Sequence, residues 1–330
     1  MIRYLTVLLF LTFSLPLFAE KKPPYEYYHL GNQVDITSTT QPGIVLMDGG
    51  TDVDAAFQWM CELSGNGDFL VIRATGTDAY NPYIQQLCPN SNSVATLIIP
   101  TIEAANDEFA INTINQAEAV WIAGGDQSYY TNYWKGTPVQ EALNDRILQG
   151  IPIGGTSAGL NVLTQFIYSA LLSKGVTSSQ ALADPFSKYI TLDRDLVNIP
   201  ILQGIIGDAH LITRDRMGRD IAFLCCIYEN GWSDQPRSIS IDEETALLID
   251  AHGSGTVVGK SNVYFLQALG APEVCKAGNP LTYKDINVYR INAAGGKYQL
   301  WNWHGMGGSE YLVSAVEGVL ISDQDNFSPY

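Results

Sequence analysis

A serine between two glycines is the strongest chemical signal in the sequence. Ser157 lies in Gly155-Thr156-Ser157-Ala158-Gly159, which matches the G-x-S-x-G pattern of serine hydrolases. The apolar run Ile151–Ile153 precedes this motif, and apolar residues at helical spacing follow it: Leu160, Val162, Leu163, Phe166 and Ile167. A strand, a sharp turn and a helix would expose the serine, and the amide of Ala158 could stabilise an oxyanion. We therefore predict that Ser157 is a nucleophile; the alternative is a serine that only caps a helix.

A serine nucleophile needs a base, and three histidines are candidates. His210 follows an apolar run in Gly204-Ile205-Ile206-Gly207-Asp208-Ala209-His210, whereas His252 adjoins a turn and His304 lies in an irregular segment. His29 comes before the first predicted strand of the sheet. We predict that His210 is the base, because the end of a strand is where the serine also lies.

Three arginines follow this histidine and lie within a span of six residues: Arg214, Arg216 and Arg219. A cationic cluster beside a serine and a histidine suits a substrate carboxylate, which arginine binds with two parallel hydrogen bonds. The alternative is local pairing with Asp215 and Asp220.

A third group should orient the imidazole, and three acids offer it. Asp242, Glu243 and Glu244 follow the strand-like run Ser238–Ile241. Their spacing alone does not select one of them, and a solvated acidic turn is the alternative.

Short apolar runs alternate with helical patterns in the middle of the chain. The predicted strands are Gly43–Leu46, Phe69–Ile72, Ala95–Ile99, Ala119–Ala123 and Ile151–Ile153, and the predicted helices are Asp52–Leu63, Asp107–Gln116 and Thr137–Gln149. This alternation predicts an α/β fold with a mostly parallel sheet covered by helices on both faces. The glycine pairs Gly49-Gly50, Gly124-Gly125 and Gly154-Gly155 lie at strand ends, where such sheets carry their sites.

The pattern changes after about residue 236. The short runs there predict additional, antiparallel C-terminal strands: Ser238–Ile241, Ala246–Ile249, Thr256–Val258, Val263–Leu266 and Val288–Ile291. The last segment, Tyr298–Tyr330, gives no clear element. We divide the chain into residues 1–19, a signal peptide; 20–42, an N-terminal extension; 43–258, a catalytic domain; and 259–330, a β-rich extension of that domain.

Taken together, the motifs resemble the cyanophycinase group of serine peptidases, which are relatives of the α-aspartyl dipeptidases. The resemblance covers roughly Gly43 to Val258 and rests on Gly124-Gly125-Asp126-Gln127, the serine motif, Asp208-x-His210 with the three arginines, and Ile241-Asp242-Glu243. It implies a fold like that of the class I glutamine amidotransferases. It also implies a triad of Ser157, His210 and Glu243.

The resemblance assigns further roles and a substrate. It implies an oxyanion hole from the Gly125 and Ala158 amides, and substrate contacts from Gln127, Asp208, Arg214, Arg216 and Arg219. The substrate would be cyanophycin, a polyaspartate with arginine on its side chains, cleaved to β-Asp-Arg dipeptides by a homodimer. Two positions depart from the group: Ala209 stands where glutamine is common, and Tyr129 where a basic residue is usual. Other aspartyl peptides are therefore the alternative substrate.

Competing function classes make different demands on the sequence. An α/β-hydrolase would use His252 or His304, in the chain order serine, acid, histidine. A glutamine amidotransferase needs a cysteine at position 157, where this chain has serine. A non-catalytic binding protein on the same fold is the remaining alternative.

Composition excludes several partners. The 330 residues carry 34 Asp+Glu against 18 Lys+Arg, for a net charge of −16, which disfavours nucleic acid and anionic membranes. Arg3 and the apolar run Tyr4–Phe13, with Ala19 at the predicted cleavage point, indicate a signal peptide; a membrane anchor is the alternative, but about 20 apolar residues are needed to span a bilayer. We expect a secreted or periplasmic protein.

The cysteines and histidines predict disulfides but no metal site. Export allows disulfides, and five cysteines leave at least one thiol unpaired in the monomer. Cys61 with Cys88 is the favoured pair. Four scattered histidines give no zinc spacing, so we expect no metal and no cofactor.

Overall fold

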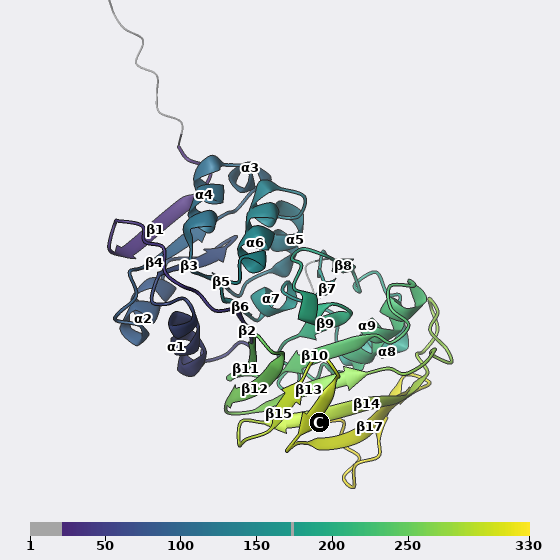
Figure 1. Cartoon of the computed structure of the whole chain (residues 1–330). Coiled ribbons are helices and arrows are strands. Elements are labelled where there is room, and N and C mark those ends of the chain that lie inside the picture. Colours follow the sequence, from purple (N-terminus) through teal and green to yellow (C-terminus); the bar gives the residue numbers. More distant parts are fainter. Residues whose placement is uncertain (1–21, 173–174) are drawn as a thin grey trace, which may run out of the picture.

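The computed structural model describes residues 22–172 and 175–330 (Figure 1). The predicted signal peptide, residues 1–19, lies outside the described residues. Within them, the strands form two sheets, one of ten strands and one of eight. The prediction of a mixed α/β fold with a parallel-rich sheet is confirmed.

The first sheet holds the strands predicted in the middle of the chain. Its order is β1-β4-β3-β5-β6-β2-β11-β12-β15-β16, and the run from β4 to β2 is parallel. Its strands are β1 (Glu26–Gly31), β2 (Gly43–Met47), β3 (Asp68–Arg73), β4 (Ser93–Ile98), β5 (Ala119–Ile122), β6 (Ile153–Thr156), β11 (Thr245–Asp250), β12 (Ser254–Gly259), β15 (Lys297–Gln299) and β16 (His304–Met306). Every residue of β4, β5 and β6 is buried, which explains their continuous apolar character.

Helices lie on both sides of the parallel strands (Figure 1). One core cluster joins the sheet to α1 (Asp54–Leu63) and α2 (Tyr80–Leu87) through side chains such as Phe57 and Ile84. The other joins it to α3 (Ile102–Ala105), α4 (Glu108–Gln116), α5 (Gln127–Tyr133) and α6 (Pro138–Leu148). The Asp126 carboxylate caps α5 by accepting from the Ser128 amide at 2.9 Å, so α5 begins directly after the Gly124-Gly125 pair.

The second sheet was not anticipated as a separate layer. Its order is β18-β17-β14-β13-β10-β9-β7-β8, in which β7, β9 and β10 are parallel. Its strands are β7 (Phe166–Tyr168), β8 (Leu192–Arg194), β9 (Ile205–Asp208), β10 (Arg237–Ile241), β13 (Asn262–Gln267), β14 (Tyr283–Asn292), β17 (Ser309–Val316) and β18 (Val319–Ser322). The short 3-10 helix η1 (Pro200–Leu202) precedes β9, while α8 (Ser178–Ala183) and α9 (Met217–Glu229) share a core cluster with this sheet.

Two expectations for local structure are wrong. The helix predicted after Ser157 to include Ile167 ends at Asn161, because α7 spans only Ala158–Asn161 and Phe166–Tyr168 forms β7. The Thr164 side chain helps to end the helix, since its hydroxyl bonds the backbone of Asn161, Phe166 and Gly207.

The second wrong expectation concerns the C-terminal segment. Residues 298–330, expected to lack clear elements, contain β16, β17, β18 and most of β15. These strands are short or half-exposed, so they show little apolar patterning.

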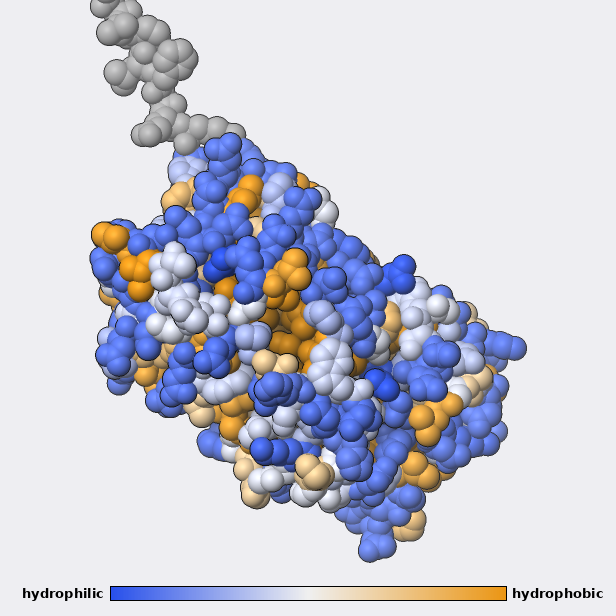
Figure 2. Space-filling view, in the orientation of Figure 1, coloured by the Kyte–Doolittle hydropathy of each residue, from blue (hydrophilic) through white to orange (hydrophobic). Residues whose placement is uncertain are grey.

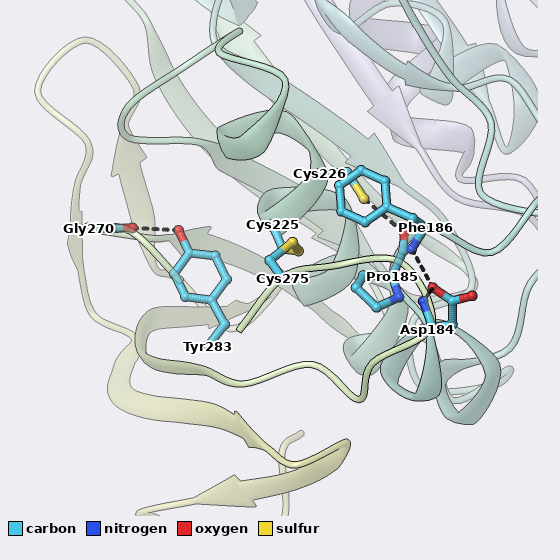
Figure 3. Close-up of a disulfide and its surroundings, with 9 residues drawn as sticks. Asp184, Pro185, Phe186, Cys225, Cys226, Gly270, Cys275 and Tyr283 are labelled. Carbon is cyan, nitrogen blue, oxygen red and sulfur yellow. Dashed lines mark hydrogen bonds between the residues drawn. A yellow bond between two sulfur atoms is a disulfide. The ribbon is translucent and has the colours of Figure 1, made fainter. Parts of the chain in front are cut away.

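Two disulfides are present in the described chain. Cys61–Cys88 confirms the predicted pair, with Cα atoms 6.3 Å apart, and it links α1 to the end of α2. The unpredicted pair Cys225–Cys275 links α9 to the segment between β13 and β14 (Figure 3). Cys226 is the unpaired thiol; it is buried and donates to the carbonyl of Pro185 at 2.9 Å.

The surface in the view of Figure 2 is mostly hydrophilic, with an apolar area near its middle. In the part of the chain that the structure describes, every helix is too short or too polar to cross a bilayer.

Candidate functional site

Ser157 lies at a sharp turn between β6 and α7. Its backbone adopts φ 51° and ψ −110°, a region that residues with side chains rarely occupy. The turn needs glycine on both sides. A Cβ atom on Gly155 would lie 2.6 Å from the carbonyl carbon of Gly159, and one on Gly159 would collide with the carbonyl oxygen of Ile122. This is the strand–turn–helix context that the sequence motif predicted.

The structure brings Ser157, His210 and Glu243 into one chain of hydrogen bonds. Ser157 Oγ lies 3.1 Å from His210 Nε2, and His210 Nδ1 lies 2.7 Å from Glu243 Oε1. The imidazole also lies against Gly49, where a Cβ atom would stand 2.5 Å from His210 Cε1. The Gly49-Gly50 pair therefore makes room for the histidine at the end of β2.

The three acids that the sequence could not separate have different positions. Glu243 contacts the imidazole. Asp242 accepts hydrogen bonds from the amides of residues 212 and 213 and from the Ser261 hydroxyl. Glu244 pairs with Lys260. Of these three acids, Glu243 is therefore the one in a position to orient the imidazole.

The other candidate histidines are distant from the serine. His252 follows β11, which runs antiparallel to β2, so it lies at the opposite edge of the sheet from Ser157. His304 lies on β16, the last strand of that sheet, and both side chains are exposed. His29 lies on β1, at the other end of the strand order.

Asp48 is a site residue that the sequence analysis missed. Its carboxylate is 1 % exposed and accepts from the Gly49 amide at 2.6 Å and from the His210 amide at 2.8 Å. Its Oδ1 also lies 3.6 Å from His210 Nδ1. Asp48 follows β2 of the first sheet and His210 follows β9 of the second, so this carboxylate joins the two sheets at the site. The only signal in the sequence is its place before Gly49-Gly50.

The site electrostatics favour a neutral imidazole. Burial lowers the pKa of His210, and the charges of Arg214 and Arg216 lower it further, against the opposing effect of Glu243. The hydrogen bond from His210 lowers the pKa of Glu243. Burial raises the pKa of Asp48 to about 7, although its two backbone donors favour the ionised form. A neutral histidine beside an ionised Glu243 can accept a proton.

We expect Asp48→Asn to destabilise the protein. The carboxylate accepts from two backbone amides, whereas an asparagine has one oxygen and would present an NH2 group to the second amide. A buried donor left unpaired costs about 1–3 kcal/mol, which denaturant unfolding would measure. Asp54→Asn is the control, because its exposed carboxylate accepts from the Tyr83 hydroxyl and an amide oxygen can do the same. Equal stability of Asp48→Asn and wild type would contradict the expectation.

The predicted arginines form one wall of a cavity of about 220 Å³ that Ser157 and His210 also line. Arg219 is 1 % exposed and binds both carboxylate oxygens of Asp208, one of them from Nε at 2.6 Å. Arg216 donates to the carbonyl of Ala209 at 2.6 Å and lies 3.7 Å from Asp208. Arg214 is exposed at the mouth.

Asp208 lies behind this wall, out of contact with the cavity. Its side chain is fully buried; burial alone would raise its pKa, but Arg219 and Arg216 hold that pKa at about 2. The sequence predicted a substrate contact here. The structure instead places an ionised Asp208 where it fixes Arg219.

The remaining predicted residues surround the serine. Gly125, with φ 155°, and Gln127 line the cavity, and Gln127 Nε2 donates to the carbonyl of Tyr168 at 3.1 Å. Ala158 is the first residue of α7, so its amide has no partner within that helix. Tyr129 and Ala209 are the two positions at which the sequence departs from the cyanophycinase group. Tyr129 stacks on Tyr133 with ring centroids 5.5 Å apart, and Ala209 is buried.

No cluster of three or more histidine, cysteine or acidic side chains that could hold a metal ion occurs among residues 22–172 and 175–330.

Comparisons with known proteins identify the relatives of this chain. Residues 73–183, which include Ser157 but not His210 or Glu243, match the model of Peptidase family S51. Over these residues the chain is similar to the S51 peptidases. The predicted resemblance to the cyanophycinase group of peptidases is thereby confirmed.

Individual relatives match this chain over part of their length. It is 26% identical over 195 residues to the cyanophycinase of Trichormus variabilis, covering 57% of this chain and 59% of that protein. It is 28% identical over 153 residues to the cyanophycinase of Geminocystis herdmanii, covering 46% and 49%. The match thus spans about half of each curated relative's length.

A solved peptidase from an acI-B1 Actinobacterium resembles this chain in fold. The TM-score is 0.52 at 17% identity, over 78% of this chain and 96% of that one.

Proposed function

We propose that the protein is an exported serine peptidase that hydrolyses aspartyl peptides through an acyl-enzyme. The observation that carries the proposal is the hydrogen-bond chain from Ser157 to His210 at 3.1 Å and on to Glu243 at 2.7 Å. The S51 match supports the same reaction class. A fold like that of the class I glutamine amidotransferases is part of the proposal.

Each group of the site has a role in the proposed mechanism. Ser157 Oγ attacks the substrate carbonyl while His210 Nε2 takes its proton, and Glu243 holds the other ring nitrogen. The amides of Gly125 and Ala158 stabilise the oxyanion. His210 then protonates the leaving amine, and water hydrolyses the ester on Ser157. The strained backbone of Ser157 keeps its hydroxyl exposed to the cavity.

The substrate class follows from the cationic wall. Arg214, Arg216 and Arg219 offer donors to substrate carboxylates, and Asp208 keeps Arg219 charged and in place. The relatives named cyanophycinase support cyanophycin as the substrate, with β-Asp-Arg dipeptides as products. The net charge of −16 suits a polymer that also carries guanidinium groups.

Hydrolysis of purified cyanophycin by residues 20–330 tests the proposal, with products identified by mass. Release of β-Asp-Arg dipeptides is the expected result. Cleavage of other α-aspartyl peptides but not of cyanophycin would make those peptides the substrate class. Ala209 and Tyr129 would then be the first residues to replace in a search for the cause. Absence of cleavage of any aspartyl peptide would overturn the proposal.

The pH dependence of kcat/KM follows from the lowered pKa of His210. The neutral imidazole is the active base, so kcat/KM should stay constant through neutral pH and fall only below the ordinary histidine pKa of about 6.5. Glu243 raises the pKa of His210, so Glu243→Gln should move this acid limb to lower pH while it reduces the rate. A limb centred above pH 7 in the wild-type enzyme would contradict the assignment.

Export and self-association belong to the proposal as separate claims. Signal cleavage after Ala19 predicts a mature chain that begins at Glu20, which N-terminal sequencing of exported protein would test. A homodimer predicts twice the monomer mass in analytical ultracentrifugation.

A further inference from the structure

Asn161 lines the cavity of Ser157 and carries a buried amide oxygen without a partner. The residue ends α7, one turn after the serine, and is 3 % exposed. Its backbone amide donates to the Ser157 carbonyl at 3.1 Å, and its carbonyl accepts from the Thr164 hydroxyl at 3.3 Å. Its side chain lines the cavity, and its Oδ1 has no hydrogen-bond partner among the described residues.

An unpaired buried oxygen is unfavourable for the free protein. Such a group loses its hydration without gaining a partner, whereas a leucine of similar shape would avoid that loss. Within the described residues, no protein group donates a hydrogen bond to Asn161 Oδ1. A substrate N–H in the cavity would satisfy it.

Asn161 Oδ1 differs from the other side-chain acceptors of the cavity. Arg214, Arg216 and Arg219 provide only donors, which bind carboxylates. Asp126 and Gln127 also carry acceptor oxygens at the cavity, but Asp126 is exposed and Gln127 is half-buried. Among these three residues, Asn161 is the one whose acceptor oxygen is buried without a partner in the described chain.

We propose that Asn161 is a specificity-determining residue that accepts a hydrogen bond from the side-chain amide N–H of the aspartyl residue whose carbonyl Ser157 attacks. A free aspartate side chain is a carboxylate and offers acceptors only, whereas an amide-linked aspartate side chain offers an N–H. Asn161 therefore selects aspartyl residues with an amide-linked side chain. The inference rests on the proposed function, because it assumes a peptide bound at Ser157.

The test compares Asn161→Leu with wild type on two peptides of the same length. One carries arginine amide-linked to the aspartate side chain, and the other carries the free side chain. We expect kcat/KM for the amide-linked peptide to fall about tenfold or more, and that for the free peptide to change little. Stability should stay equal or rise, since an apolar side chain replaces an unpaired buried amide; a purely structural Asn161 would instead lose stability.

An unchanged ratio of the two kcat/KM values would overturn the inference. If the wild type cleaves neither peptide, binding to Ser157→Ala decides, measured by calorimetry with and without Asn161→Leu. Equal affinity in the two proteins, or no binding to either, also overturns it. Fluorophosphonate labelling of Ser157 separates this failure from that of the proposed function, because labelling needs the activated serine but no peptide contact with Asn161.

Discussion

Replacing Ser157 with alanine should lower kcat by about 10⁶-fold and leave the fold intact. The hydroxyl is the only part of the side chain that the substitution removes, and its partner is His210 Nε2 at 3.1 Å. Alanine should tolerate the positive φ of 51° about as well as serine, so the turn persists. Hydrolysis of aspartyl peptides and labelling by a fluorophosphonate both report on this atom.

Histidine variants provide the matched control. His210→Ala should lose both hydrolysis and labelling, while His304→Ala should retain them, because His304 is exposed on the last strand of the first sheet. Melting curves show that each variant is folded. Activity in His210→Ala combined with inactivity in His304→Ala would favour an α/β-hydrolase instead.

Removal of the Arg219 side chain should give the largest loss of stability. Asp208 is fully buried and Arg219 binds both of its carboxylate oxygens, so Arg219→Met leaves a buried charge with only Arg216 nearby, at 3.7 Å. Breaking such a pair typically costs about 3–5 kcal/mol. Urea unfolding measures this loss without reference to any substrate.

Two further variants make the interpretation specific. Arg214→Met removes an exposed arginine from the same cavity and should change the free energy of unfolding by less than about 0.5 kcal/mol. Adding Asp208→Asn to Arg219→Met should recover part of the loss, since the uncompensated charge is then gone. Equal stability of Arg214→Met and Arg219→Met would show that the buried pair is not what stabilises this region.

Local patterns in the sequence were sufficient for the parallel half of the fold. Strands such as Ala119–Ile122 are buried on both faces, and glycines at their ends mark the edge where Ser157 lies. Cys61 and Cys88 were paired correctly. The placement of His210 against Ser157 agrees with its prediction as the base.

Features that depend on contacts between distant segments were not predictable. Nothing near Asp48 in the sequence shows that its carboxylate reaches the amide of His210, 162 residues later. Asp208 is close to His210 in the sequence and was predicted to contact substrate. In the structure it is buried and binds Arg219, which lies on α9. Phe166 and Ile167 were predicted as part of a helix, because a short apolar run is compatible with a helix or a strand. The pairing of β7 with β8 and β9 makes it a strand.

The proposed triad draws on both sheets, and this has a consequence for biosynthesis. Ser157 follows β6 of the first sheet, His210 follows β9 of the second, and Glu243 lies in the link from β10 to β11. During synthesis, Ser157 therefore leaves the ribosome before His210 and Glu243 do. Because the sheets must also close on each other, hydrolytic capacity arises only when folding is complete.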